Sequence, residues 1–193
     1  MKKSESILKL EMLGLNTLDY FITKDQKEAL HYLAKHADDL LSMRTERGVE
    51  EFQCPFYYMM KGSTLIDIAT GHLAQGYKLI FSPSLDTKGC LAFGTVGLGA
   101  SAETIMEYVI GEGKVRELDN HPNKRFLMIP SGAIIACRDR TERDHAYILN
   151  GIYLRVKEAC YGEMPCVVEW SYYDHSVGMK GTPDIYWEIR DYA

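Results

Sequence analysis

Hydrophobic and polar residues alternate near the C-terminal end of the chain, first over residues 166–173 and again over residues 184–191. A period of two is typical of a β-strand, because successive side chains of a strand point to opposite faces. The segment between the two runs contains glycine and proline, so we expect the strands to form an antiparallel hairpin. On the first strand the alternation predicts two faces, made by Cys166, Val168 and Trp170 and by Val167, Glu169 and Ser171.

The second strand carries charged residues, and an antiparallel hairpin would place them beside the first strand. Its alternation separates two sets, Ile185, Trp187 and Ile189 on one face and Tyr186, Glu188 and Arg190 on the other. Pairing of the strands then places Glu169, Glu188 and Arg190 on one surface. Two carboxylates beside a guanidinium can hold a divalent metal ion and a phosphate. The alternative is a half-buried hairpin whose polar face is only solvated, and geometry alone favours this alternative.

Helical and extended patterns follow one another along the rest of the chain. Apolar residues at helical spacing predict four helices. They cover residues 6–13, the segment that follows the capping signature Thr23-x-x-Gln26, residues 64–73 and residues 141–160. Gly162 is the predicted C-cap of the last helix. Extended runs predict strands over 18–22, 40–44, 77–82, 90–96, 104–110, 126–129 and 133–137, the last two joined by Pro130-Ser131-Gly132. Helices and strands mix early and hairpins dominate late, which predicts an α+β fold with two lobes.

Composition narrows the class of protein. A chain of 193 residues, 46% hydrophobic and 25% charged, is long enough for one sizeable domain or two small lobes. The net charge of −5 does not suit a nucleic-acid partner, and no apolar run approaches the length of a membrane span. The five cysteines include no C-x-x-C pair, so we expect neither a disulfide framework nor a structural zinc site, but the reduced thiols of a cytoplasmic protein.

No short sequence motif identifies a catalytic or ligand-binding site by itself. There is no Gly-x-x-x-x-Gly-Lys-Ser/Thr loop, and the pairs Gly97-x-Gly99 and Gly111-x-Gly113 are more often turns than phosphate-binding loops. The six histidines show no spacing typical of metal ligands. Arg44 follows an extended segment, where a guanidinium can bind phosphate through two hydrogen bonds, although composition alone favours a surface turn.

Three segments together resemble the nucleotide-binding domain of the pyruvate phosphate dikinase and phosphoenolpyruvate synthase family. Residues 3–23 are similar to the family's opening, in which a lysine precedes a short helix, a glycine and a strand ending in threonine, although the family's prolines are missing here. Met43-Arg44-Thr45-Glu46 resembles the family's Val-Arg-Ser-Ser. Residues 148–190 resemble a helix followed by strands with Ile-Glu-Trp and Gln-Ala-Arg, present here as Val168-Glu169-Trp170 and Glu188-Ile189-Arg190.

The resemblance implies an ATP-grasp type fold, in which two α+β lobes with mixed or antiparallel sheets sandwich ATP. Residues 1–193 would form a single compact unit, with 1–60 and 141–193 in one lobe and 61–140 in the other. The family's motifs imply a role for each matching residue. Lys3, Arg44 and Arg190 would contact the phosphates of ATP, with both arginines acting in catalysis; Tyr58 and Met59 would lie on the strand that binds adenine; and Glu169 and Glu188 would hold Mg²⁺.

The chain departs from the family at the metal site. The family has an aspartate two residues before Glu169, where this chain has Val167. Glu188 replaces the family's glutamine, which either restores a second metal carboxylate or marks a site that has drifted. We therefore expect a Mg-ATP-dependent phosphotransferase, such as a kinase, or a ligase whose acceptor the sequence does not specify. The alternatives are a non-catalytic nucleotide-binding or regulatory module, acting with a partner protein or as a homo-oligomer, and a structural domain without a ligand.

Overall fold

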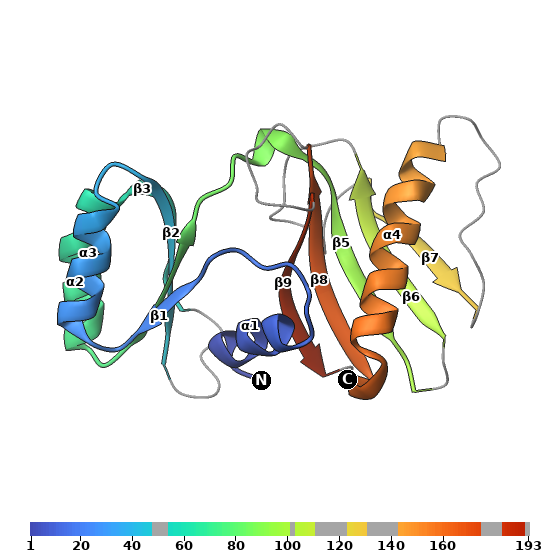
Figure 1. The fold of residues 1–193 in the computed structure, drawn as a ribbon, viewed down its shortest axis with the longest axis horizontal. Helices are drawn as coiled ribbons and strands as arrows, with labels where there is room; N and C mark the ends of the chain where they lie inside the picture. The colour runs from blue at the N-terminus through green and yellow to red at the C-terminus, as the bar shows by residue number, and fades with distance from the viewer. Residues whose placement is uncertain (48–53, 101–102, 111–122, 131–142, 175–182, 192–193) are drawn as a thin grey trace. The chain divides into compact units, whose positions relative to one another are not determined.

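The computed structural model describes residues 1–47, 54–100, 103–110, 123–130, 143–174 and 183–191. These residues form four α-helices and nine strands, and the strands pair only in the antiparallel sense, in a four-stranded and a five-stranded sheet (Figure 1). The predicted α+β class is confirmed. The chain divides into two compact units, one made by Met1–Glu5 and Leu18–Leu85 and the other by Ser6–Thr17 and Asp86–Ala193. We call them unit 1 and unit 2.

Unit 1 is a four-stranded sheet with two helices. Its elements are β1 (Phe21–Thr23), α2 (Gln26–Lys35), β2 (Leu40–Glu46), β3 (Phe56–Lys61), α3 (Gly62–Ala74) and β4 (Lys78–Pro83), and its strand order is β1-β4-β2-β3. Buried apolar side chains of α2 and α3 pack on those of β2 and β4, and this contact forms the unit's core. The members of the core are Ala29, Leu33, Leu41, Met43, Leu65, Ala69, Leu79 and Phe81.

The start of α2 shows how local chemistry sets a helix boundary. The predicted cap was Thr23, but Asp25 is the N-cap, and its carboxylate accepts the backbone N–H of Glu28 at 2.9 Å. A carboxylate in this position satisfies a backbone donor that has no partner inside the helix. Thr23 supports the cap instead, because its hydroxyl accepts the Asp25 N–H at 2.9 Å and donates to the Glu28 carboxylate at 2.7 Å.

Unit 2 is a five-stranded sheet covered on one face by a long helix. Its elements are β5 (Cys90–Leu98), β6 (Thr104–Ile110), β7 (Arg125–Ile129), α4 (Arg143–Ala159), β8 (Cys166–Tyr173) and β9 (Asp184–Asp191), with short 3₁₀ turns at Thr87–Gly89 (η1) and Tyr161–Glu163 (η2). The strand order is β7-β6-β5-β8-β9. Helix α1 (Lys3–Met12) contributes its first residues to unit 1 and the rest to unit 2.

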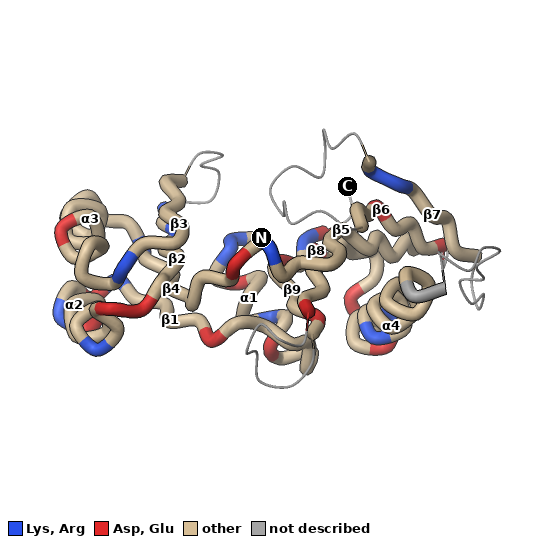
Figure 2. The backbone as a smooth tube through the Cα atoms, turned by 90° about the horizontal axis from the view of Figure 1, so that it is seen from above, with Lys and Arg blue, Asp and Glu red and all other residues tan. Residues whose placement is uncertain are grey.

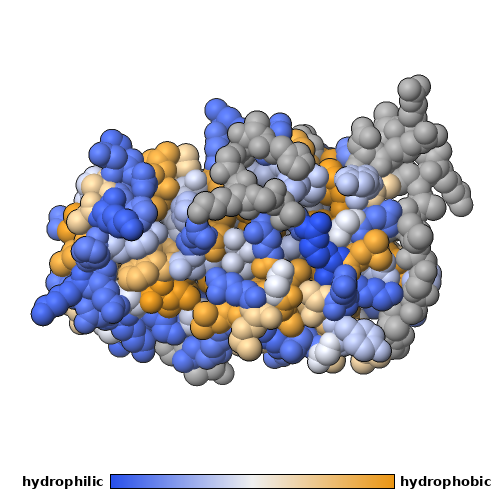
Figure 3. All heavy atoms as spheres, viewed as in Figure 1, coloured by the Kyte–Doolittle hydropathy of each residue, from blue (hydrophilic) through white to orange (hydrophobic). Residues whose placement is uncertain are grey.

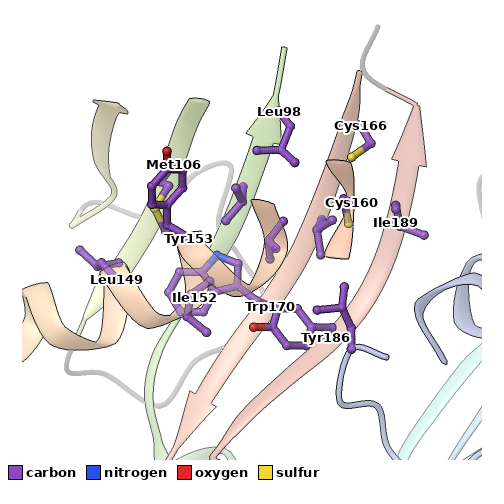
Figure 4. Close-up of a cluster of buried hydrophobic side chains, with 14 of the residues drawn as sticks. Leu98, Met106, Leu149, Ile152, Tyr153, Cys160, Cys166, Trp170, Tyr186 and Ile189 are labelled. Atoms are coloured by element: carbon purple, nitrogen blue, oxygen red, sulfur yellow. The ribbon is translucent and has the colours of Figure 1, made fainter. Parts of the chain in front are cut away.

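The core of unit 2 lies between α4 and the sheet (Figures 1 and 4). Leu149, Ile152, Tyr153 and Val156 of α4 pack with Val96, Met106, Val168 and Trp170 of the sheet. The spacing of the four α4 residues is helical, and the sheet residues alternate along their strands, as a helix packed on one sheet face requires. The core face predicted for the first C-terminal strand, with Cys166, Val168 and Trp170, is therefore confirmed.

Three predictions about the fold need correction or fall outside the described residues. Gly162 lies inside the 3₁₀ turn η2 and does not have the positive φ of a capping glycine, so it does not end α4 as predicted. The predicted strand over 133–137 lies outside the described residues. The lobes also divide differently, because β5 pairs with β8 over its whole length, which joins residues 90–98 to the C-terminal part of the chain.

Hydropathy and charge vary over short distances in the parts of the described chain that Figures 2 and 3 show. No helix among the described residues combines the length and hydrophobicity that a membrane span requires. On the face shown in Figure 3, hydrophobic residues form small groups among hydrophilic ones. Acidic and basic positions are interspersed along the described backbone (Figure 2).

Candidate functional site

The hairpin of β8 and β9 brings the three predicted charged residues onto one face of the unit 2 sheet. Glu169 lies directly opposite Glu188, and Val167 lies opposite Arg190. Side chains of directly opposed residues have Cβ atoms about 4.5–5.5 Å apart, so the two carboxylates are neighbours. Arg190 Nη2 lies 3.6 Å from Glu169 Oε1, and these two side chains are 53% and 35% exposed. The three groups therefore form one solvent-accessible cluster, which we call the β8–β9 charge cluster.

A β-bulge in β9 sets which side chains join this cluster. Glu169 pairs with Glu188 but Trp170 pairs with Tyr186, so Trp187 is an extra residue on β9. The strict alternation predicted for β9 is therefore wrong at three positions, Ile185, Tyr186 and Trp187, and Ile185, which pairs with Ser171, lies on the face of Glu169. Tyr186 is buried in the core with Ile189, whereas Trp187 Nε1 donates to Ser171 Oγ at 2.6 Å. Bulges often turn side chains toward a functional surface, and this one moves an indole off the predicted core side.

The outer edge of β9 is closed by the N-terminal part of unit 2. The Ile189 N–H donates to Ser6 Oγ at 2.7 Å, and the Tyr186 N–H donates to the Asn16 carbonyl at 2.8 Å. Both are backbone donors on an edge strand, which otherwise remain open to pairing with another chain. These bonds fix the backbone on either side of Glu188 and so hold its carboxylate in place opposite Glu169.

A third carboxylate lies in the same row across the sheet. Thr95 of β5 is opposite Glu169 of β8 on one side and Glu107 of β6 on the other, so all three share one face. Glu107 also pairs with Lys124, at 3.7 Å between Oε2 and Nζ. Glu107 was not predicted from the sequence, because its position in the row depends on β5 lying between β6 and β8. Among the described residues no three acidic, histidine or cysteine side chains are close enough together to bind one metal ion.

The predicted residues Lys3 and Arg44 belong to unit 1. Arg44 is exposed on β2, and its guanidinium lies 4.3 Å from the centre of the Phe56 ring, a cation–π contact. Lys3 is the first residue of α1. The next residue, Ser4, is held by Glu46, whose carboxylate accepts the Ser4 N–H at 2.8 Å and the Ser4 hydroxyl at 2.9 Å. A carboxylate at a helix N-terminus accepts hydrogen bonds from the free N–H groups there, and its negative charge interacts favourably with the positive end of the helix dipole.

Glu46 is a buried charge with a complete set of partners. Lys78 Nζ lies 2.8 Å from its Oε1 and also donates to Ser4 Oγ at 2.8 Å. Burial by itself raises the pKa of Glu46, but the hydrogen bonds from Lys78 and Ser4 outweigh burial, and the pKa lies below its ordinary value. This network fixes the amino end of α1, which carries Lys3. The sequence has no local signal for it, because Ser4 and Glu46 are 42 residues apart.

Tyr58 and Met59, the predicted adenine-binding residues, form a second bulge. Leu41 pairs with Met60 and Met43 with Tyr57, so Tyr58 and Met59 together face only one residue of β2. Met59 has a φ of +56°, a left-handed conformation that costs a non-glycine residue about 1–2 kcal/mol. Its N–H donates to Ser84 Oγ at 3.1 Å, and the Tyr58 hydroxyl donates to the Leu85 carbonyl. The bulge thus fastens β3 to the segment after β4.

The structure divides the predicted site residues between the two units. Glu169, Glu188 and Arg190 are brought together in unit 2, and Lys3, Arg44, Tyr58 and Met59 lie in unit 1. The juxtaposition of the first three is an observation. The roles assigned to all seven residues stay predictions.

Comparison with known proteins identifies structures with a similar fold but no relative with a similar sequence. No protein-family model and no curated protein sequence matches the chain. Three similar solved structures are those of macrocyclase MdnC from Microcystis aeruginosa bound with precursor peptide MdnA, D-alanyl-alanine synthetase A from Vibrio cholerae, and the ADP complex of the N5-carboxyaminoimidazole ribonucleotide synthetase PurK. Their sequence identities are 8%, 10% and 13%, and their TM-scores are 0.53, 0.51 and 0.55.

The matches extend over almost the whole of this chain. They cover 97%, 98% and 97% of it, but 51%, 54% and 45% of the three solved chains, so this chain spans about half their length. At these identities the likeness shows the fold alone. The fold that the three structures share with this chain is the ATP-grasp fold, and the closer resemblance to the dikinase family stays a prediction. The protein therefore has an ATP-grasp fold, α+β with two antiparallel sheets.

Proposed function

We propose that the protein binds Mg-ATP and uses it as an ATP-dependent ligase or phosphotransferase. Of the two classes we favour a ligase, because the similar structures are those of a macrocyclase and two synthetases, enzymes named for joining reactions. The observation that carries the proposal is the β8–β9 charge cluster, in which Glu169 and Glu188 are cross-strand neighbours beside Arg190. On an ATP-grasp fold, two accessible carboxylates beside a cation are the groups that a metal–nucleotide complex needs.

The chemistry of these donors suits Mg²⁺. Magnesium prefers oxygen ligands and is usually held by one or two carboxylates, with phosphate oxygens and water completing the octahedron. Glu169 and Glu188 supply two carboxylates from adjacent, hydrogen-bonded strands. The bound Mg-ATP would supply the phosphoryl group that activates the acceptor. The third carboxylate, Glu107, lies two strands away from Glu169 and is paired with Lys124, so we leave it outside the metal set.

Arg190 would act by moving between two partners. In the protein without ligand its guanidinium balances the charge of Glu169. An exposed ion pair of this kind stabilises a protein by at most about 1 kcal/mol, so breaking it costs little. Arg190 would then bind a phosphate oxygen while Glu169 turns to the metal. Phosphoryl transfer depends mainly on fixed cations around the moving group, which is the role proposed for Arg190 and, from unit 1, for Arg44 and Lys3.

The remaining predicted contacts complete the proposal. Tyr58 and Met59 would border the adenine, and the strained backbone at Met59 supports a functional role, because strain of this kind gathers at binding sites. The acceptor is unspecified. The similar structure of MdnC contains a precursor peptide, which supports peptides as one class of acceptor or partner to test.

One observation favours a second candidate, a nucleotide-binding module without catalysis. The position opposite Arg190 is Val167, where the resemblance predicts a metal-binding aspartate. If two carboxylates hold the metal too weakly for transfer, the protein would bind ATP and not consume it.

A thermal-shift titration with Mg-ATP tests binding. A ligand that binds only the folded state at one hundred times its Kd stabilises that state by about 2.7 kcal/mol, which is roughly 5–10 °C for a chain of this size. Glu169→Gln and Glu188→Gln should remove the Mg²⁺-dependent part of the shift. The matched control is Glu158→Gln, an exposed glutamate on α4, which should leave the shift unchanged.

Turnover separates the two candidates. ADP release is measured with Mg-ATP and a panel of free amino acids and short peptides as acceptors. Acceptor-dependent ADP release that Glu169→Gln abolishes supports the ligase, and binding without release supports the module. The absence of any shift at millimolar Mg-ATP contradicts both.

A further inference from the structure

Two parallel rows of side chains cross the face of the unit 2 sheet that lies opposite α4. The first row starts at the β8–β9 charge cluster and ends on β7, the outermost strand of the described sheet. Its members, each directly opposite the next, are Glu188, Glu169, Thr95, Glu107 and Phe126. Leu127 and Ile129 of β7 pack in the core beside α4, so Phe126, which alternates with them, points to the other face.

The second row lies beside the first and is mostly apolar. Its members, again each directly opposite the next, are Arg190, Val167, Gly97, Ile105 and Met128. They share a face with the first row, because residues two apart on a strand point the same way. Val167 and Ile105 are partly exposed. A ligand lying along the two rows would therefore meet polar groups on one side and apolar groups on the other.

Both rows end on β7 in exposed apolar side chains. Phe126 is 64% exposed and Met128 is 66% exposed. Single exposed apolar residues are common on protein surfaces, but here two of them stand together and Ile105 continues the patch toward the centre of the sheet. Lys124 holds the aromatic ring in place, because its Nζ lies 5.0 Å from the centre of the Phe126 ring and 3.7 Å from Glu107 Oε2. The ring is thus positioned beside the polar row before any ligand arrives.

The length of the rows sets the length of a ligand that uses both ends. Neighbouring strands lie about 4.7–4.9 Å apart, so the steps from β8 through β5 and β6 to β7 span about 14 Å. An extended peptide advances about 3.3–3.6 Å per residue, so about four residues cover this distance. A single amino acid is too short to reach from Glu169 to Phe126.

We propose that this face binds an extended peptide as the acceptor, with its reacting end at the β8–β9 charge cluster and an apolar side chain about four residues away on Phe126 and Met128. The assignment of the reacting end rests on the proposed function, whereas the apolar end rests on the two rows alone. Glu107 and Lys124 neutralise each other, so the middle of the peptide needs no charge. Its backbone groups can form hydrogen bonds with the side chains of Thr95 and Glu107.

Methyl NMR of protein with isotope-labelled methionine tests the apolar end without any nucleotide. Met128→Leu identifies the Met128 methyl signal. The probes are Gly-Gly-Gly-Leu and Leu-Gly-Gly-Gly, since the proposal does not specify which end of the peptide reacts, with tetraglycine as the reference. At least one leucine peptide should shift the Met128 signal and bind about tenfold more tightly than tetraglycine, through partial burial of its side chain. Phe126→Ser should remove this gain, and the control Tyr147→Ser, at an exposed position of α4, should keep it.

Acceptor-dependent ADP release then tests the length. In glycine peptides with one leucine placed second, fourth or sixth from the reacting end, kcat/KM should be highest at about the fourth position, and Phe126→Ser should abolish the preference. Leucine peptides that leave the Met128 signal unchanged, or a preference that survives in Phe126→Ser, would overturn the inference and leave the proposed function intact. A Met128 shift in a protein that does not bind Mg-ATP would support peptide binding and contradict the proposed function. A Met128 signal that responds to protein concentration and not to peptide would assign the patch to a second copy of the chain and overturn the inference.

Discussion

Gly94 in the centre of the unit 2 sheet allows a quantitative test of how the sheet is built. A Cβ atom at this position would lie 2.0 Å from the Glu107 carbonyl oxygen and 2.9 Å from the Tyr108 Cα. Both neighbours are backbone atoms of the paired strand β6, so no side-chain rotation can relieve the contact. Gly94→Ala must therefore push β5 and β6 apart by about 1 Å. Overpacking of this kind costs typically 1–3 kcal/mol, and we expect about 3 kcal/mol because backbone must move.

Gly151→Ala adds the same methyl group to the same unit and is the control. Gly151 is exposed in the middle of α4, and a Cβ atom added there would meet nothing within 4 Å. Alanine is a better helix former than glycine by about 1 kcal/mol, so this variant should be more stable than the parent. The two substitutions should thus move the free energy of unfolding in opposite directions.

Tryptophan fluorescence in a urea titration measures the stability changes of both variants in unit 2, where the two substitutions lie. The chain has two tryptophans, and both lie in unit 2, on β8 and β9. Trp170 is buried, so its emission changes when the unit unfolds. The free energy follows from the linear dependence on urea. A Gly94→Ala protein within about 0.5 kcal/mol of the parent would refute the close approach of β5 and β6.

Three further predictions concern single side chains. Arg190→Met should change the stability of the free protein by less than about 1 kcal/mol, yet weaken Mg-ATP binding about tenfold, as measured by calorimetry; a loss of stability without a loss of affinity would make Arg190 structural. Met59→Gly should raise the melting temperature followed by circular dichroism, because glycine accepts the positive φ of this bulge, and a lower value would contradict the strain. The lowered pKa of Glu46 gives stability that is present above its ordinary pKa of 4.5 and is lost as the pH falls through the folded value. Glu46→Gln should therefore destabilise the protein at pH 7 and much less at pH 3, and an equal loss at both would contradict the charged network.

The C-terminal hairpin shows how far sequence reasoning reaches. Alternation predicted both strands, their antiparallel pairing and the shared surface of Glu169, Glu188 and Arg190, because these depend on local periodicity. It did not predict the bulge at Trp187, because a bulge is fixed by partners elsewhere in the chain, such as Ser171, Ser6 and Asn16. Local patterns carry no information about such contacts.

The position of Glu107 and the division into units were missed for a related reason. Both depend on β5 pairing with β8 across about 70 residues, and strand order cannot be read from periodicity. The Ser4–Glu46–Lys78 network also joins distant parts of the chain. The elements were thus largely predictable, whereas the neighbours of the site residues required the fold.

The most direct test of the central claim is a crystal structure with Mg²⁺ and a non-hydrolysable ATP analogue. The account predicts one Mg²⁺ bound by carboxylate oxygens of both Glu169 and Glu188, at about 2.0–2.1 Å, with phosphate oxygens in the remaining positions. It also predicts that Arg190 has left Glu169 and contacts a phosphate. A nucleotide bound with neither glutamate on the metal, or with Arg190 still paired to Glu169, would contradict the account.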